Sequence, residues 1–321
     1  MDEQESLKSK VGIFSDAVNP ASFKILTQPD YIFLCGGHLN DFKHSLRAHF
    51  YKYKVQTNPD LLKRVQLAEK ADEWYQSRKV FADLLELEEH LAGLSACILL
   101  FVESPGAIAE FGAFSQMKLL QDKLVVVIED GHFGQTSFIR NGLVEHAQRI
   151  RPESVLSYPW LSTPLSGGPS EIDPAGATDT LDRVAEEVQQ ILGKKPKTTT
   201  FRPEDHGHLM LLIADLVTLN VVIVQNELQE ILGSLGVSSK LPELKKYLFL
   251  LDQLRLISTF HYGNVNYFMN PSGGPEYVDY SPKSPTDRSR LRVLLRKDAP
   301  LTPEKNKALA AFSRRAAGGT L

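Results

Sequence analysis

Short apolar runs alternate with amphipathic stretches through the first 195 residues of the chain. The runs are rich in β-branched residues or leucine and are too short for helices, so they predict buried strands. We expect these strands at 31–35, 96–102 and 124–128, with a further edge strand at 154–158. The stretches between them have helical apolar spacing and predict helices within 41–53, 60–93, 107–120, 137–145 and 180–192. Alternating strands and helices predict a Rossmann-like α/β domain with a parallel sheet.

A different pattern begins near residue 204. It predicts helices at 204–219, 224–232 and 241–256, followed by two short strands within 257–269 that turn at Gly263-Asn264. Three helices and a hairpin form the order of a winged helix-turn-helix. We therefore divide the chain into an α/β domain at 1–195, a linker at 196–203, a winged-helix-like domain at 204–297 and a basic tail at 298–321.

Composition narrows the class of protein. The chain has 321 residues, of which 42% are apolar and 23% are charged, as in soluble globular proteins. It contains no apolar run long enough to cross a bilayer, and its acidic start at 1–5 is unlike a signal peptide. Cys35 and Cys97 lie in apolar runs without C-x-x-C spacing, which favours a reducing cytoplasm and argues against disulfides and zinc. His206 and His208 lack a third ligand, so we expect no metal and no cofactor.

Charge is distributed unevenly along the chain. Residues 201–321 carry 15 Lys and Arg against 12 Asp and Glu, a net of +3, whereas the rest of the chain has a net of −6. The excess of positive charge in residues 201–321 suggests that the C-terminal part contacts a polyanion. Candidate nucleic-acid contacts are Lys245 and Lys246 on the third predicted helix, and Arg288, Arg290, Arg292 and Arg296 beyond the hairpin. The alternative is that the winged-helix-like domain binds protein, since the same helix also carries Glu243 and Asp252.

The most informative stretch of the sequence is 97–114. An apolar run ends in Ser104-Pro105-Gly106, a turn that opens a helix, and Glu110 is expected in the first turn of that helix. Helix N-termini usually receive a ligand's negative charge, so Glu110 is a candidate nucleophile. The alternative is a glutamate that complements the helix dipole, and position alone leaves both interpretations open.

Other candidates surround this stretch. Gly36 and Gly37 follow the first strand and would let a ligand approach the backbone. Ser104 and the N–H groups of Gly106 and Ala107 could hold sugar hydroxyls or a phosphate. Glu103 could orient Glu110 or bind a ribose hydroxyl, and Glu88 could bind substrate. The alternative for these two acids is a solvated loop and a solvated helix face.

These residues resemble a known family. Phe33-Leu34-Cys35-Gly36-Gly37, Glu103-Ser104-Pro105-Gly106 and Ala109-Glu110-Phe111-Gly112-Ala113-Phe114 are similar to motifs of the nucleoside 2-deoxyribosyltransferase superfamily. More narrowly, Glu103 to Ser115 resembles the motif of deoxyribosyltransferase-like effectors of bacterial retrons, which join this domain to a C-terminal winged-helix-like domain. Ala107 stands where the broad family has Thr, and Ser104 stands where many transferases have Asp, which favours hydrolysis over transfer to a base.

The resemblance implies an N-glycoside-cleaving toxin of an antiphage system, with Glu110 as nucleophile. It implies a nucleotide-like substrate, with NAD among the candidates. It also implies partnership with a retron reverse transcriptase and its msDNA, an RNA–DNA hybrid, and it allows a higher-order assembly. The competing interpretation is a nucleotide-sensing, DNA-binding transcriptional regulator whose α/β domain binds its ligand without cleaving it.

Overall fold

The chain forms two compact units in a computed structural model. One, the sheet unit, consists of Pro29–Lys195, and the other, the helical unit, combines Met1–Gln28 with Pro196–Leu321. The structure describes residues 2–26, 28–78, 80–133, 137–163, 169–194, 196, 198–237, 241–270, 273–280 and 288–317. No helix within these residues is long and apolar enough to cross a membrane.

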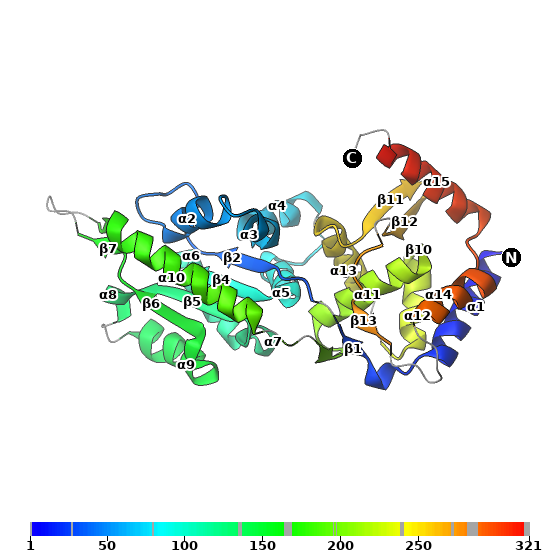
Figure 1. Cartoon of the computed structure of the whole chain (residues 1–321), viewed down its shortest axis with the longest axis horizontal. Coiled ribbons are helices and arrows are strands. Elements are labelled where there is room, and N and C mark those ends of the chain that lie inside the picture. Colours follow the sequence, from blue (N-terminus) through cyan, green and yellow to red (C-terminus); the bar gives the residue numbers. More distant parts are fainter. Residues whose placement is uncertain are drawn as a thin grey trace. The chain divides into compact units, whose positions relative to one another are not determined.

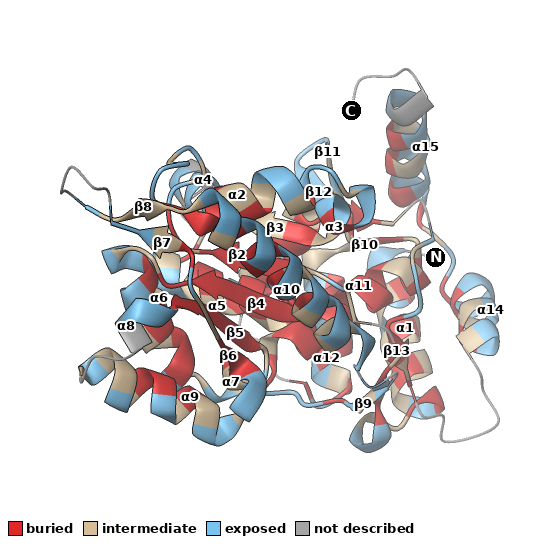
Figure 2. Cartoon of the chain, turned by 60° about the vertical axis from the view of Figure 1, so that its left-hand side comes forward, coloured by how far each residue is buried: buried red, intermediate tan, exposed pale blue. Residues whose placement is uncertain are grey.

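The sheet unit is built on a five-stranded parallel sheet in the order β3-β2-β4-β5-β6 (Figure 1). The strands are β2 (Ile32–Cys35), β3 (Val65–Leu67), β4 (Cys97–Phe101), β5 (Leu124–Glu129) and β6 (Val155–Tyr158). Residues of β2, β4 and β5 are buried throughout, because helices cover both faces of the sheet and no face is left for polar side chains (Figure 2). The predicted α/β class with a parallel sheet is confirmed.

Two groups of helices cover the two faces. Leu34, Leu99 and Val127 pack with Leu46 and Val184, so helices α2 and α10 lie over one face. On the other face Phe33 packs against Phe114 of α6, with ring centroids 6.4 Å apart. The helical elements of this unit are α2 (Leu46–Phe50), η2 (Tyr51–Val55), α3 (Pro59–Arg64), α4 (Ala68–Arg78), α5 (Leu84–Leu94), α6 (Pro105–Gln116), α7 (Lys118–Gln121), α8 (Asp130–Phe133), η3 (Ile139–Val144), α9 (Glu145–Ile150), η4 (Pro152–Ser154) and α10 (Pro174–Gly193).

Two features of the sheet unit differ from the sequence-based expectation. Strand β3 interrupts the segment 60–93, where periodicity predicted helix, because three residues are too few to show alternation and only pairing with β2 identifies them. Helix α10 begins at Pro174 with Asp173 as its N-cap, six residues before the start of the helix predicted at 180–192, and β7 (Leu161–Ser162) pairs with β8 (Glu171–Ile172) just before it.

The helical unit contains the predicted helices and hairpin together with an additional strand. Helix α11 (His206–Asn220), β10 (Val222–Val224), α12 (Gln225–Ser234), α13 (Leu241–Gln253), β11 (Ser258–Tyr262) and β12 (Val265–Met269) follow in that order. The three strands form an antiparallel sheet in the order β10-β12-β11. Two further helices complete the unit, α14 (Arg288–Asp298) and α15 (Pro303–Ala317), so much of the expected basic tail is helical. The last residues of that tail, 318–321, lie outside the described residues.

Residues 1–28 belong to the helical unit, although local patterning placed them with the α/β domain. They form α1 (Glu3–Ala17), η1 (Pro20–Ser22) and β1 (Lys24–Ile25). Strand β1 lies between β9 (Thr199–Thr200), inside the expected linker, and β13 (Val278–Asp279). These pairings join segments that are far apart in the chain, and two-residue strands carry no periodic signal from which they could be predicted.

Candidate active site

The segments that carry the candidate chemistry meet at the carboxyl edge of the sheet. Strands β2 and β4 are parallel neighbours, with Cys35 opposite Leu100. The turn Gly36-Gly37 after β2 and Glu103-Ser104 after β4 therefore lie side by side, as expected for a ligand site in an open α/β sheet.

Ser104 is the N-cap of α6. Its Oγ accepts a hydrogen bond of 3.1 Å from the N–H of Ala107, and Pro105 occupies the first helical position. The Ser104 hydroxyl and the Ala107 N–H, both proposed from the sequence to hold substrate, thus bind each other. Gly106 is exposed next to them, and a Cβ at this position would meet only Ser104 Oγ, 3.9 Å away.

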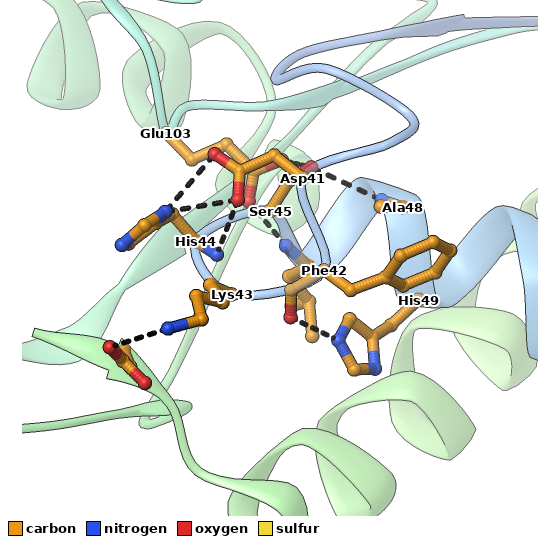
Figure 3. A network of polar contacts seen from close by, with 10 residues as sticks. Asp41, Phe42, Lys43, His44, Ser45, Ala48, His49 and Glu103 are labelled. Carbon is orange, nitrogen blue, oxygen red and sulfur yellow. Dashed lines mark hydrogen bonds and ion pairs between the residues drawn. The ribbon is translucent and has the colours of Figure 1, made fainter.

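Glu103 anchors the loop that leads from β2 into α2. Its Oε1 accepts hydrogen bonds from Ser45 Oγ at 2.6 Å and from the N–H groups of Gly37 and Arg47 at 3.3 and 3.2 Å, and Oε2 accepts from the N–H of Leu46 at 2.7 Å. Figure 3 shows Ser45 and Glu103 beside this loop, together with the hydrogen bond between His44 and Asp41. Burial raises the pKa of Glu103 to about 7, although these hydrogen bonds act to lower it. Both oxygens of the carboxylate are already bonded to the protein, so this group holds the loop and the N-terminus of α2.

Gly36 and Gly37 are needed for close contact between protein segments. Gly36 has φ of +138°, and a Cβ there would lie 2.7 Å from the carbonyl oxygen of Phe101. A Cβ on Gly37 would lie 2.8 Å from Glu103 Oε1. The sequence suggested that these glycines make room for a ligand, but the room is taken by β4 and by the Glu103 carboxylate.

Glu110 lies in the second turn of α6, one turn beyond the expected position, because the helix already begins at Pro105. The side chain is partly buried, and its Oε2 is a buried atom that has no hydrogen-bond partner among the described residues. Burial raises the pKa of Glu110 to about 7, while Arg47 acts to lower it and Glu69 acts to raise it. A buried carboxylate oxygen without a hydrogen bond retains unmet capacity to accept one.

Glu88 lies on α5, the helix that precedes β4. It is 6% exposed, so it does not lie on a solvated helix face. Burial, then the charge of Glu110, then that of Asp72 raise the pKa of Glu88 to about 8. Burial and charge thus raise the pKa values of both carboxyl groups toward neutral pH, the range in which a carboxyl group can exchange a proton with a ligand.

The structure adds two residues that the sequence did not single out. Arg47 is buried at the start of α2, and its guanidinium group forms a bidentate ion pair with Glu69 of α4, both N···O distances being 2.7 Å. A charged residue between the apolar Leu46 and Ala48 was the available signal, but the sequence could not show its partner 22 residues away.

The candidate nucleic-acid contacts are scattered over the helical unit. On α13, Lys245 is exposed and Lys246 forms a 2.8 Å ion pair with Glu243. On α14, Arg288 pairs with the buried Asp215 and with Glu276. Arg290 and Arg296 are exposed and Arg292 is partly exposed. In a helix, residues four apart lie on the same side, so Arg288, Arg292 and Arg296 share one side of α14 and Arg290 lies on another. The four arginines therefore do not form a single basic surface.

Within the described part of the chain, no group of three or more His, Cys, Asp or Glu side chains is arranged so that it could hold a metal ion. Two hollows of about 320 and 410 Å³ lie elsewhere on the sheet unit. Both hollows are lined by Asn58 and Leu61, which precede β3, and by Gln189 of α10. Glu88, Glu103 and Glu110 line neither hollow.

Comparisons with known proteins agree on one family. Residues 43–259 match the model described as "STM3845 retron effector protein". The chain is 24% identical over 243 residues, 71% of its length and 74% of the relative's, to the "Retron Ec73 putative ribosyltransferase/DNA-binding protein" of Escherichia coli. It is 32% identical over 128 residues, 39% of each chain, to the "Retron Ec86 putative ribosyltransferase/DNA-binding protein" of the same species. The matched region spans Glu88, Glu103 and Glu110 and continues to residue 259, within the helical unit, and on this evidence the chain belongs to the STM3845 family of retron effector proteins.

Proposed function

We propose that this retron effector cleaves the N-glycosidic bond of a nucleotide-like substrate, with Glu110 as nucleophile and Glu88 as the acid that protonates the leaving base. The observation that carries the proposal is the Glu110 carboxylate itself, which lies on α6 beyond the turn that follows β4 and whose buried Oε2 bonds to none of the residues that the structure describes. Glu88 is 6% exposed, and burial followed by the charge of Glu110 raises its pKa, which supports its role as the acid. Two relatives carry the description "putative ribosyltransferase/DNA-binding protein". This description supports cleavage at C1′, since ribosyl transfer also breaks the bond between C1′ and the base.

The chemistry follows from the two protonation states. The Glu110 carboxylate adds to C1′, the electron pair of the C1′–N bond passes to the base, and the Glu88 carboxyl gives that base its proton. A water molecule then gives a proton to Glu88 and adds to C1′, which releases the Glu110 carboxylate. The products are the free base and the hydrolysed sugar. NAD is a candidate substrate, because loss of nicotinamide breaks the same kind of bond. Its nicotinamide ring is cationic and leaves as a neutral base, so this substrate needs no proton from Glu88.

In this proposal Glu103 positions the loop after β2 and takes no part in the chemical step. Its carboxylate is engaged by four donors, which supports an anchoring function for Glu103. Gly106 is then the exposed backbone group of the α6 N-terminus that could meet a substrate hydroxyl or phosphate.

The first test is release of free base from a panel of nucleotides, including NAD, by the purified full-length protein. Glu110→Gln is expected to abolish release, and Glu88→Gln is expected to lower it most for substrates with a poor leaving base. Glu89→Gln, next to Glu88 on α5 and partly exposed, is the matched control and should retain activity. Unchanged release by a folded Glu110→Gln protein would contradict the assignment.

A role in binding is the second part of the proposal. The order α11-β10-α12-α13-β11-β12 and the sheet β10-β12-β11 support a winged-helix-like domain that engages msDNA or the reverse transcriptase. Much of α13 packs inward, through Leu244, Tyr247, Leu248, Leu250 and Leu251, which leaves Lys245 as its exposed cation. Because most of α13 is buried, nucleic acid would be contacted through other elements such as α14, or the partner of this domain would be a protein.

The alternative function is a nucleotide-sensing regulator that binds DNA without cleaving its nucleotide. The winged-helix order favours it, as does the DNA-binding part of the two relatives' descriptions. Co-purification of reverse transcriptase and msDNA with the tagged protein supports the effector, whereas sequence-specific binding to a promoter, without release of base from any nucleotide, supports the regulator.

A further inference from the structure

Lys10 and Lys305 are two buried lysines of the helical unit that share one carboxylate. Each lysine side chain is 2% exposed, and that of Glu227 is 4% exposed. Glu227 Oε1 accepts a hydrogen bond of 3.1 Å from Lys10 Nζ and one of 2.5 Å from Lys305 Nζ. Its Oε2 accepts from the N–H of Val224, at the start of the same helix, at 3.2 Å. One carboxylate therefore joins α1, α12 and α15.

This cluster of Lys10, Glu227 and Lys305 carries two cations and one anion. Lysines are almost never fully buried unless they are paired, and a buried charge without a counter-charge is costly. Burial lowers the pKa of Lys10 to about 8, while the charge of Glu227 acts to raise it and that of Lys305 acts to lower it. Withdrawal of either lysine would leave a balanced pair, so α1 and α15 compete for the Glu227 carboxylate.

Helix α15 covers one face of the sheet β10-β12-β11 (Figure 1). Within 303–315, the part of α15 whose side chains are described, the buried residues are Lys305, Ala308 and Phe312. The Phe312 ring meets that of Phe260 on β11 edge-on, with centroids 5.6 Å apart. Ala308 and Phe312 also pack against the sheet residues Val222, Tyr267 and Met269. One of the three buried side chains that hold α15 is therefore a lysine in the cluster with excess charge.

The residues just before α15 also bear on how firmly it is held. Residues 299–302 connect α14 to α15 outside either helix, so α15 can move while α14 stays in place. Thr302 in this connection is 3% exposed, and its Oγ1 is a buried atom without a hydrogen-bond partner among the described residues. An unsatisfied buried hydroxyl costs free energy that contact with water restores. Both Thr302 and Lys305 therefore lower the free energy gained when α15 docks.

We propose that α15 is a releasable cover over the β10-β12-β11 sheet and that the cluster is its release device: when Lys305 withdraws, Lys10 and Glu227 remain as a balanced ion pair. Release of α15 exposes the apolar sheet face around Phe260, so the device controls access to that face. The proposal does not depend on the chemistry assigned to Glu110, which lies in the other unit.

The test is hydrogen–deuterium exchange of the full-length protein, measured by mass spectrometry at one pH. Lys10→Met leaves Glu227 to Lys305 alone, so the amides of α15 are expected to exchange more slowly, by about tenfold or more. Because coupling is reciprocal, Lys305→Met should slow exchange in α1. Glu227→Gln leaves two unpaired cations and should speed exchange in both helices. The controls are Lys8→Met on α1 and Lys307→Met on α15, both at exposed positions.

Two results would overturn the proposal. One is exchange of α15 in Lys10→Met that is no slower than in the parent protein; if this variant fails to fold, exchange of α1 in Lys305→Met decides the matter. The other is exchange of α15 in the parent protein as slow as that of the buried helix α11, because α15 would then leave only when the whole unit unfolds. Slower exchange of α15 in Lys10→Met and of α1 in Lys305→Met, with both controls unchanged, supports it.

Discussion

The carboxylate of Glu103 accepts a 2.7 Å hydrogen bond from the backbone N–H of Leu46, a residue 57 positions earlier in the chain. Through this bond the segment after β4 fixes the N-terminus of α2, and α2 carries Arg47. At the carboxyl edge of the sheet, the Glu103 carboxylate after β4 therefore holds the loop after β2 in place through hydrogen bonds.

Replacing Glu103 should destabilise the sheet unit. Glu103→Gln substitutes an NH₂ group for one of two acceptor oxygens and leaves at least one buried backbone donor unpaired, so a loss of about 1–3 kcal/mol is expected. Urea unfolding followed by circular dichroism measures it. Glu153→Gln, an exposed glutamate of the same unit, is the control and should change stability by less than about 0.5 kcal/mol.

Gly36→Ala should destabilise the protein, and Gly112→Ala should not. At Gly36 the new Cβ meets the Phe101 carbonyl oxygen at 2.7 Å in a backbone conformation with φ of +138°, which costs roughly 1–3 kcal/mol. Gly112, within α6, has open space around its Cβ position, so alanine there should stabilise by about 0.4–1 kcal/mol. Thermal unfolding of both variants checks the pair, and equal melting temperatures would contradict the account of Gly36.

Stability should fall as pH rises through neutrality. Burial raises the pKa of Glu88 to about 8 and those of Glu103 and Glu110 to about 7, from 4.5. Between these values the folded state binds more protons than the unfolded state, so the free energy of unfolding decreases with pH in this window. Glu88→Gln should flatten the dependence and raise stability at pH 8. Urea unfolding at pH 5 and pH 8 measures it, and an unchanged slope in this variant would count against a protonated Glu88.

Arg288 should matter for folding and not for binding nucleic acid. It pairs with Asp215, which is 0% exposed and also accepts hydrogen bonds from the Tyr280 hydroxyl and the Tyr277 N–H. Arg288→Met leaves a buried anion without its cation, which costs about 3–5 kcal/mol. Chemical unfolding of the helical unit tests this. A variant as stable as the parent protein would show that Arg288 is available for other contacts.

The remaining arginines of α14 should contribute to nucleic-acid binding through phosphates. Changing Arg290, Arg292 and Arg296 together to Gln should weaken binding to msDNA, and the salt slope of log K should fall by roughly 0.7–0.9 per lost contact. Fluorescence anisotropy at several salt concentrations measures both. Arg183→Gln, an exposed arginine of the sheet unit, is the control. An unchanged slope in the triple variant would assign recognition to another surface.

The sequence by itself determined the elements whose residues form a local pattern. The strands at β2, β4, β5 and β6, the helix after Ser104 and the hairpin at Gly263 follow from apolar runs, turn residues and helical spacing. The motif around Glu110 also indicated the family, because its residues are contiguous.

Tertiary structure decided what depends on contacts between distant segments. Pairing with β2 identified β3, and pairing with β9 and β13 placed residues 1–28 in the helical unit. It also bonded the Glu103 carboxylate to the loop after β2 and joined Arg288 to Asp215, and burial raised the pKa values of Glu88 and Glu110. The physical reason is that a side chain's burial, partners and pKa are set by neighbours brought together in folding, whereas periodicity reports only which face of its own element it occupies.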